Sequence, residues 1–408
     1  MQPNPCGGVM SIYFEAAANL LPWMIEMRRQ VHAHPEVRWS EEGTIMLIKQ
    51  LNSSSYSHAS FLHHDYQGGF VLDVISGIDL PIMAFRADLD ALPIQEETGL
   101  PFASQVPGVS HACGHDLHIA MVLGVARAVA AGLVKPTHNL RLLFQRAEEN
   151  PGAPPDPNSG GYYLAQEGAL IGVTKLYVLH VLSTLKTGSI YSCEGPIMGN
   201  SDRVCVKIKA LGGHVAHNAD ARDVNALRIA SECIPMLEAI VNPLAGRNIS
   251  CEPTGLIAGK GQSSSNIMPS EAEAWLACRT YLGADERTAL HEGIKRQISG
   301  NVARYSNNRA SAEVTVIPGH PATINHGFAG FKSTLEASGI AVLDKAPELG
   351  GDDASHLGNY VVQQGGEFVY AFIGAGGEGF ADHHTPQFNP DESAMQLGLE
   401  AYLALACS

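Results

Sequence analysis

The stretch from Ser110 to His118 carries the densest group of chemically versatile side chains in the sequence. Five of them can bind or orient a metal ion: His111, Cys113, His115, Asp116 and His118. Thiolate and imidazole ligands suit zinc and its neighbours in the transition series. Gly114 lets the backbone turn, so that Cys113 and His115 can point to one place. The spacing therefore predicts a metal site built around this turn.

Two kinds of metal site are compatible with such a cluster, a structural one and a reactive one. A structural zinc site needs a second Cys/His pair to close the tetrahedron, and none lies close by in the sequence. An apolar, alanine-rich run from Leu117 to Ala131 predicts a helix directly after the cluster. The cluster is thus expected on a loop that enters a helix N-terminus, where anionic ligands are also favoured.

Two aspartates follow a run that is typical of a buried strand. The run Pro81–Arg86 leads into Asp88 and Asp90. Carboxylates two residues apart on an extended chain face the same side. Either aspartate could hold a metal-bound histidine in its tautomer, and turn-capping aspartates are the alternative.

A second strand-like run, Asn139–Gln145, leads to the adjacent carboxylates Glu148 and Glu149. At a curled strand end both can reach one cavity, one as a ligand and the other as a base; a solvated charged turn is the alternative. A third run, Lys175–Leu179, delivers His180 at its end. Open α/β sheets place their sites at the carboxyl ends of strands, so these side chains are expected to meet.

The elements that position these residues alternate between strand and helix, which predicts an α/β fold with two domains. A mixed α/β catalytic sheet covered by helices is expected over residues 11–198 and 319–408. From residue 199 the order becomes β-α-β-β-α-β, a ferredoxin-like unit inserted over residues 199–318. His214 follows the first strand of this unit, and Asn266 and Arg279 lie on its later elements.

Composition narrows the classes of partner. The formal net charge of −15 over 408 residues argues against a nucleic-acid partner. No apolar stretch is long enough to span a bilayer, so no membrane partner is expected. Eight scattered cysteines without paired spacing, and no signal peptide in Met1–Met10, are typical of a cytoplasmic protein.

Six motifs in fixed order carry a family resemblance: Arg86–Pro93, His111–Asp116, Phe144–Glu149, Leu179–Val181, Gly212–His214 and His384–Pro386. Together they resemble the amidohydrolase branch of the aminoacylase/carboxypeptidase metallopeptidase family. That branch includes hippurate hydrolases, auxin–amino acid conjugate hydrolases and N-acetyl-diaminopimelate deacetylases. The resemblance covers about residues 20–405, and the family's catalytic domain with an inserted lid agrees with the two domains expected from the strand order.

The resemblance implies two divalent metal ions per chain, with zinc or manganese favoured over cobalt or nickel. Cys113 would bridge the ions as a thiolate, and four further ligands would be His115, Glu149, His180 and His384. Glu148 would be the general base, while Asp88 and Asp90 would support the ligands from behind. His383 also stands in the last motif, but the match to Thr385-Pro386 favours His384.

The resemblance further implies hydrolysis of the amide bond of small N-acyl amino acids by a metal-activated water. His214 would stabilise the oxyanion across the interface of a homodimer formed by the lid, and Asn266 and Arg279 would hold the substrate carboxylate. A dipeptidase or carboxypeptidase on the same scaffold and a non-catalytic binding protein are the alternatives. The sequence departs from the family at Arg146, where proline is usual, and at Leu182, where an aromatic residue is usual.

Overall fold

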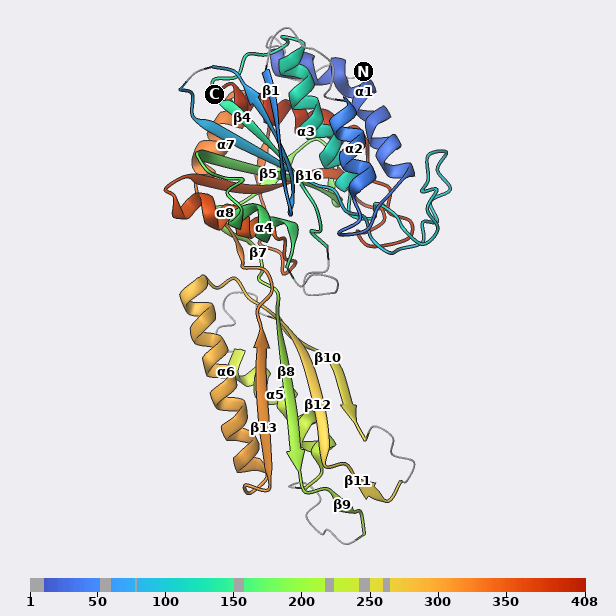
Figure 1. Cartoon of the computed structure of the whole chain (residues 1–408), viewed down its shortest axis with the longest axis vertical. Coiled ribbons are helices and arrows are strands. Elements are labelled where there is room, and N and C mark those ends of the chain that lie inside the picture. The colour runs from blue at the N-terminus through green and yellow to red at the C-terminus, as the bar shows by residue number, and fades with distance from the viewer. Residues whose placement is uncertain are drawn as a thin grey trace. The chain divides into compact units, whose positions relative to one another are not determined.

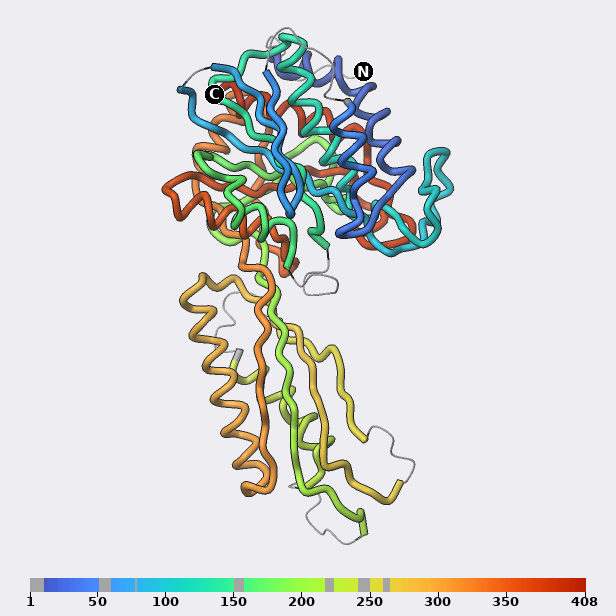
Figure 2. Tube along the Cα trace, viewed as in Figure 1, coloured from blue at the N-terminus to red at the C-terminus, as the bar shows by residue number. Residues whose placement is uncertain are grey.

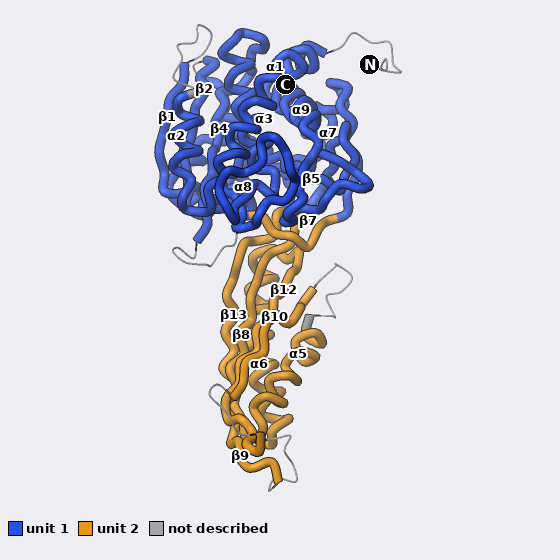
Figure 3. The backbone as a smooth tube through the Cα atoms, turned by 90° about the vertical axis from the view of Figure 1, so that its right-hand side faces the viewer, with its two compact units in different colours: residues 1–197, 324–346, 353–408 blue, residues 198–323, 347–352 orange. Residues whose placement is uncertain are grey.

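The computed structural model describes residues 11–51, 60–77, 79–149, 158–216, 224–241, 250–259 and 265–408. The chain divides into two compact units (Figure 3). Unit 1 comprises residues 1–197, 324–346 and 353–408, and unit 2 comprises residues 198–323 and 347–352. The chain colours in Figure 2 show that unit 1 is built from both ends of the chain. The short segment 347–352 belongs to unit 2, which the sequence did not predict.

Unit 1 contains an eight-stranded sheet in the order β1-β2-β4-β3-β5-β16-β6-β15 (Figure 1). Its strands are β1 (Ser60–Tyr66), β2 (Gly69–Ile75), β3 (Ile82–Asp88), β4 (Asn139–Gln145), β5 (Val173–Lys186), β6 (Ile190–Ser192), β15 (Val342–Asp344) and β16 (Glu367–Gly376). The central strands β4, β3, β5 and β16 run parallel, whereas β1 and β2 pair antiparallel with their neighbours. The predicted mixed sheet is therefore confirmed.

Helices bury both faces of this sheet. Consecutive residues of β2 and β3 are buried, so side chains pointing in either direction from these strands are covered. The helices α1 (Ile12–Ala33), α3 (His115–Ala130) and α9 (Ala394–Ala406) pack against one another. A second group packs α4 (Gly160–Gln166) against α8 (Ala354–Gln363), and α8 contacts β5 and β16. The remaining helices are α2 (Glu42–Leu51) and α7 (Phe328–Ala337).

Unit 2 contains a four-stranded antiparallel sheet in the order β10-β12-β8-β13. Its elements are β8 (Asp202–Ala210), α5 (Ala226–Val241), β10 (Ser250–Ala258), β12 (Glu271–Arg279), α6 (Ala284–Tyr305) and β13 (Ala310–Ile317). They follow the predicted β-α-β-β-α-β order. Alternate residues of β8, such as Val204, Val206 and Ile208, enter a separate core with α5 and α6.

Two short strand pairings complete the description. In unit 2, β9 (Gly213–His214) pairs with β11 (Ile267–Met268), and β7 (Gly195–Met198) pairs with β14 (Thr323–Asn325) near the passage between the units. Across the ranges described above, no helix combines the length and apolar character needed to cross a membrane.

Candidate metal centre

The turn at the start of α3, which carries the candidate metal ligands Cys113 and His115, depends on Gly114. This residue has φ +89°, and a Cβ atom there would lie 2.4 Å from Cγ2 of Val181. Glycine alone satisfies both the left-handed backbone and the close approach. The turn leaves Cys113 half-buried on one side and places the fully buried His115 as the first residue of the helix. The structure confirms the prediction that the cluster lies on a loop that enters the N-terminus of a helix.

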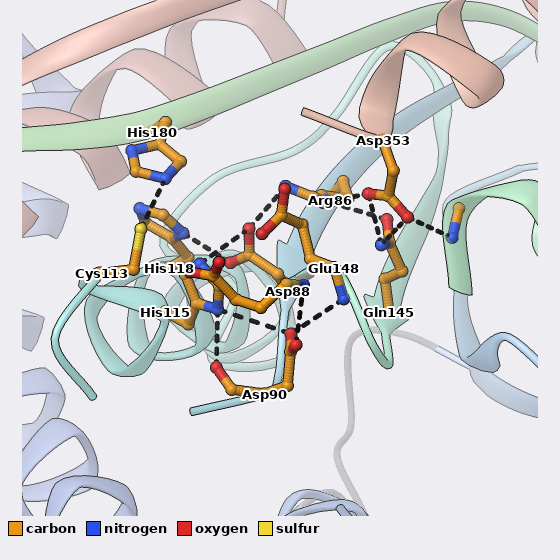
Figure 4. A network of polar contacts seen from close by, with 12 residues as sticks. Arg86, Asp88, Asp90, Cys113, His115, His118, Gln145, Glu148, His180 and Asp353 are labelled. Atoms are coloured by element: carbon orange, nitrogen blue, oxygen red, sulfur yellow. Dashed lines mark hydrogen bonds and ion pairs between the residues drawn. The ribbon is translucent and has the colours of Figure 1, made fainter. Parts of the chain in front are cut away.

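His180 presents one ring nitrogen to Cys113. Its Nδ1 lies 2.7 Å from the backbone oxygen of Val181, so Nδ1 carries the proton and donates it to that carbonyl. The other nitrogen, Nε2, lies 3.6 Å from Sγ of Cys113 (Figure 4). His180 lies within β5, which continues to Lys186 because β16 pairs with it that far. The prediction that the strand ends at Leu179 was therefore wrong.

The two neighbouring histidines of the last motif have different partners. Nε2 of His384 lies 3.2 Å from Oε1 of Glu149, and this contact raises the pKa of His384. Nε2 of His383 accepts a hydrogen bond from the backbone N–H of Ser183 at 3.2 Å, which directs its Nδ1 to Cys113 Sγ at 3.6 Å. His384 has a left-handed backbone, with φ +59°. The geometry therefore supports His384 as the partner of Glu149 in a metal site.

Asp88 is fully buried at the end of β3 and is held from two sides (Figure 4). Its Oδ2 accepts from Nη1 of Arg86 at 2.6 Å, and its Oδ1 accepts from Nδ1 of His118 at 2.6 Å. Burial acts to raise the pKa of Asp88, but Arg86, His115 and His118 together outweigh it and hold the pKa well below its usual range. Nε2 of His118 accepts from the backbone N–H of Val181 at 2.9 Å. Both ring nitrogens of His118 are thus engaged, and this residue supports the site.

Asp90 links the two halves of the site. Its backbone oxygen accepts from Nδ1 of His115 at 2.7 Å, which fixes the tautomer and aims Nε2 away from Asp90. Its carboxylate accepts from two successive backbone N–H groups, those of Glu148 at 3.0 Å and Glu149 at 2.9 Å. Asp90 therefore orients both a predicted ligand and the two adjacent glutamates.

The donor set fits a divalent cation. Ligand atoms of Cys113, His115 and Glu149 lie within 4.8 Å of one another. Among the described residues, Nε2 of His115 is buried without a hydrogen-bond partner, with Oδ2 of Asp88 at 3.5 Å, and a bound metal ion would satisfy it. Burial alone would lower the pKa of His115, but the nearby Asp88 and Asp90 raise it to about 10. The carboxylates around His115 thus favour a positive charge beside its ring. Thiolate, imidazole and carboxylate ligands together suit zinc and related ions.

The predicted residues of unit 2 fall into two places. Nδ2 of Asn266 lies 3.3 Å from Nε2 of His214, and Nδ1 of His214 accepts from the backbone N–H of Ala216 at 3.2 Å. Asn266 precedes β12, whereas Arg279 is its last residue. A nine-residue strand is roughly 30 Å long, so one chain cannot bring both to a single carboxylate. Within one chain Asn266 and Arg279 therefore lie at opposite ends of β12, and their role in holding a substrate carboxylate stays a prediction.

His118, predicted as a residue that can bind or orient a metal ion, orients Asp88 through its Nδ1. Two further supporting residues were not predicted from the sequence. Arg86 lies on the strand that ends at Asp88. Its hydrogen bond to Asp353 could not be predicted, because the two residues are far apart in the sequence. Glu41 contacts the turn before Glu148 from a distant part of the chain.

Comparison with known families decides the classification. A model of the peptidase family M20/M25/M40 matches residues 84–408. The chain belongs to this family. The M20/M25/M40 match contains every residue predicted to bind metal, from Cys113 to His384. The family resemblance found in the sequence is therefore confirmed.

Individual relatives agree with this classification. Over 388 residues the chain is 31% identical to the N-acetylcysteine deacetylase of Bacillus subtilis (strain 168), covering 94% of this chain and 96% of that protein. It is 32% identical over 317 residues to the N-acyl-L-amino acid amidohydrolase of Geobacillus stearothermophilus, covering 76% and 79%. The YXEP protein of Bacillus subtilis, a dinuclear metal-binding peptidase from the M20 family, has a similar structure, with TM-score 0.78, 28% identity and coverage of 95% and 98%. This M20/M25/M40 chain is accordingly a metal-dependent hydrolase of amide bonds.

Proposed function

We propose that the chain hydrolyses the amide bond of small N-acyl amino acids with two divalent metal ions. The observation that carries this proposal is the meeting of Cys113, His115 and Glu149, with Glu148 next in the chain to Glu149. The named activities of the deacetylase and amidohydrolase relatives support the choice of substrate class. A cytoplasmic location remains a prediction from the scattered cysteines.

Five side chains would hold the ions: Cys113, His115, Glu149, His180 and His384. Cys113 would bridge them, and this role is supported by the approach of Nε2 of His180 and of the ligand atoms of His115 and Glu149 to its sulfur. Zinc or manganese are the favoured metals, and cobalt or nickel suit the same ligands. Bound divalent cations lower the pKa of a water molecule and polarise a carbonyl group.

Glu148 would act as the general base, taking a proton from the attacking water and passing it to the leaving amine. Its side chain is mostly buried, and its backbone N–H is held by Asp90 at 3.0 Å. A carboxylate fixed in this way can accept and return a proton without a change in the backbone.

Unit 2 would supply the groups that bind the substrate. Nδ1 of His214 accepts a backbone hydrogen bond, so a neutral ring has its proton on Nε2, the nitrogen beside the side-chain amide of Asn266. With the oxygen of that amide turned toward the ring, this N–H could donate to an oxyanion. Asn266 lies beside His214, while Arg279 lies at the far end of β12. If all three serve one reaction, His214 and Asn266 must come from a second copy of the chain. We therefore propose a homodimer in which unit 2 is the lid and dimerisation domain.

One experiment tests the reaction and its substrate. The protein is stripped with a chelator and reloaded separately with zinc, manganese, cobalt or nickel. Released amine is then measured with N-acetyl, N-benzoyl and indoleacetyl amino acids and with dipeptides. We expect metal-dependent release from one of the N-acyl groups. Release from dipeptides alone would favour the dipeptidase or carboxypeptidase alternative, and no release with two bound ions would favour a binding protein.

Replacing Cys113 with serine is expected to lower the metal content and to abolish most amide hydrolysis, because a hydroxyl group remains protonated where a thiolate would bridge the ions. Metal per chain is measured by elemental analysis after extensive dialysis. The matched control is Cys193→Ser, which changes another half-buried cysteine of unit 1. Full metal content in the Cys113→Ser protein would contradict the bridging role.

A further inference from the structure

The turn that carries the two adjacent glutamates has an unfavourable backbone. Ala147, directly before Glu148, is fully buried and has φ +49°. A residue with a Cβ atom rarely adopts this left-handed conformation, and it persists only where the surroundings enforce it. The position of Glu148 therefore depends on whatever holds Ala147.

Two buried carboxylates hold three successive backbone N–H groups at this turn. Oε1 of Glu41 accepts from the N–H of Ala147 at 2.7 Å. The two oxygens of Asp90 accept from the next two groups, those of Glu148 and Glu149. Glu41 precedes α2 and Asp90 follows β3, so two segments distant in sequence converge on the turn.

Arg146 holds Glu41 in place. Its Nε donates to Oε2 of Glu41 at 2.8 Å, and its Nη2 donates to the exposed Glu42 at 2.6 Å. The guanidinium also lies over the ring of Trp39, at 5.7 Å from the centroid. Burial and the charge of Asp90 raise the pKa of Glu41 to about 7, and Arg146 opposes this rise. A proline, the residue usual here in the resembling family, would have no such group.

We propose that Glu41, fixed by Arg146, is a positioning residue that holds the Ala147 backbone and so sets the place of Glu148. The inference rests on the proposed role of Glu148 as general base. The described hydrogen bonds of Glu41 go to Arg146 and to the backbone of Ala147, and none goes to a proposed metal ligand. Glu41 would therefore influence Glu148 through the backbone of the turn. A small displacement of a catalytic group from its reacting partner is enough to slow a reaction strongly.

The test compares Glu41→Gln with Glu42→Gln. Ala147 and Arg146 donate to different oxygens of Glu41. A glutamine at position 41 has an NH₂ group in place of one oxygen, so one of these two hydrogen bonds is lost in the present arrangement. We expect kcat to fall at least 10-fold, with KM within threefold and two bound metals per chain. The control substitution is at the exposed neighbour, whose amide oxygen can still accept from Arg146, and kcat should stay within twofold. A Glu41→Gln kcat within twofold of the unaltered enzyme would overturn the proposal.

A rescue experiment separates positioning from general damage. Glycine adopts a left-handed backbone without strain. Adding Ala147→Gly to Glu41→Gln should therefore restore kcat by at least threefold, although the same change in the unaltered enzyme brings no gain. If glycine restores nothing, Glu41 does not act through this backbone.

Two further variants keep the test decisive. Should Glu41→Gln fail to fold, Arg146→Met replaces it, and an unchanged kcat in that variant would overturn the proposal. In the double variant Glu41→Gln with Arg146→Met, kcat should fall by a smaller factor than the product of the two single reductions, because the two side chains act as one unit. Glu148→Gln is measured in parallel. Near-normal turnover there overturns the base assignment, whereas normal turnover in Glu41→Gln beside an inactive Glu148→Gln overturns only the positioning role.

Discussion

Glu148→Gln is expected to lower kcat by roughly 10²- to 10⁴-fold, the usual contribution of a general base, while both metal ions stay bound. Glutamine has nearly the shape of glutamate, and the backbone N–H of residue 148 keeps its hydrogen bond to Asp90. The change therefore removes the proton acceptor and little else. Turnover of the best N-acyl amino acid and metal per chain are measured on the same preparation.

The adjacent residue provides the matched control for this prediction. Glu149→Gln should first lower the metal content, because its buried Oε1 faces His384 and shares a cluster with Cys113 and His115. The two variants change neighbouring residues whose backbones are bound by the same aspartate. If Glu148→Gln loses its metal as Glu149→Gln does, or keeps more than a tenth of the original turnover, the division of roles between them is wrong.

Local pattern was enough to predict most of the positions that deliver the metal site. Asp88 ends β3, and the glutamates follow β4 closely, as the apolar runs before them indicated. The alanine-rich run after His115 forms α3. These predictions succeed because strand ends and helix starts are decided by residues close in sequence. The order of strands and helices along the chain in unit 2 follows from the same kind of pattern.

The features that sequence reasoning missed depend on contacts between distant segments. β5 runs past His180 because β16 pairs with it, and pairing partners leave no mark in a single strand. The motif match favoured His384 over His383, but the different partners of the two rings, the carboxylate of Glu149 and the amide of Ser183, could not be read from it. The separation of Asn266 from Arg279 follows from the length of β12, which motif matching ignores.

The supporting residues show how the site is held. Each buried acid that orients the metal turn or the glutamates has a basic partner or several donors. Asp88 has Arg86 and His118, Asp90 has two backbone amides, and Glu41 has Arg146 and one backbone amide. A buried carboxylate is tolerated only with such compensation. The negative charge that attracts a cation is thus arranged before any cation binds.

Arg86→Met is expected to destabilise the protein by about 3–5 kcal/mol, the usual effect of removing one partner from a buried ion pair. The guanidinium is 1% exposed and donates to Gln145, Asp88 and Asp353 at 2.6–2.9 Å. Methionine fills much of the volume but leaves two buried carboxylates without their cation. The free energy of unfolding is measured by urea denaturation, followed by a signal from unit 1.

Arg141→Met is the control for this prediction, because Arg141 on the neighbouring strand β4 also binds a carboxylate with two nitrogens. Its side chain and that of Asp73 are 13% and 10% exposed, so water can solvate the carboxylate that is left behind. A smaller loss, on the order of 1 kcal/mol, is expected there. If both variants lose only about 1 kcal/mol of unfolding free energy, the buried carboxylates of Asp88 and Asp353 do not require the positive charge of Arg86. Arg86 would then stabilise the protein mainly through packing. A much larger loss at Arg86 would instead show that the buried carboxylates of Asp88 and Asp353 need the charge of this side chain.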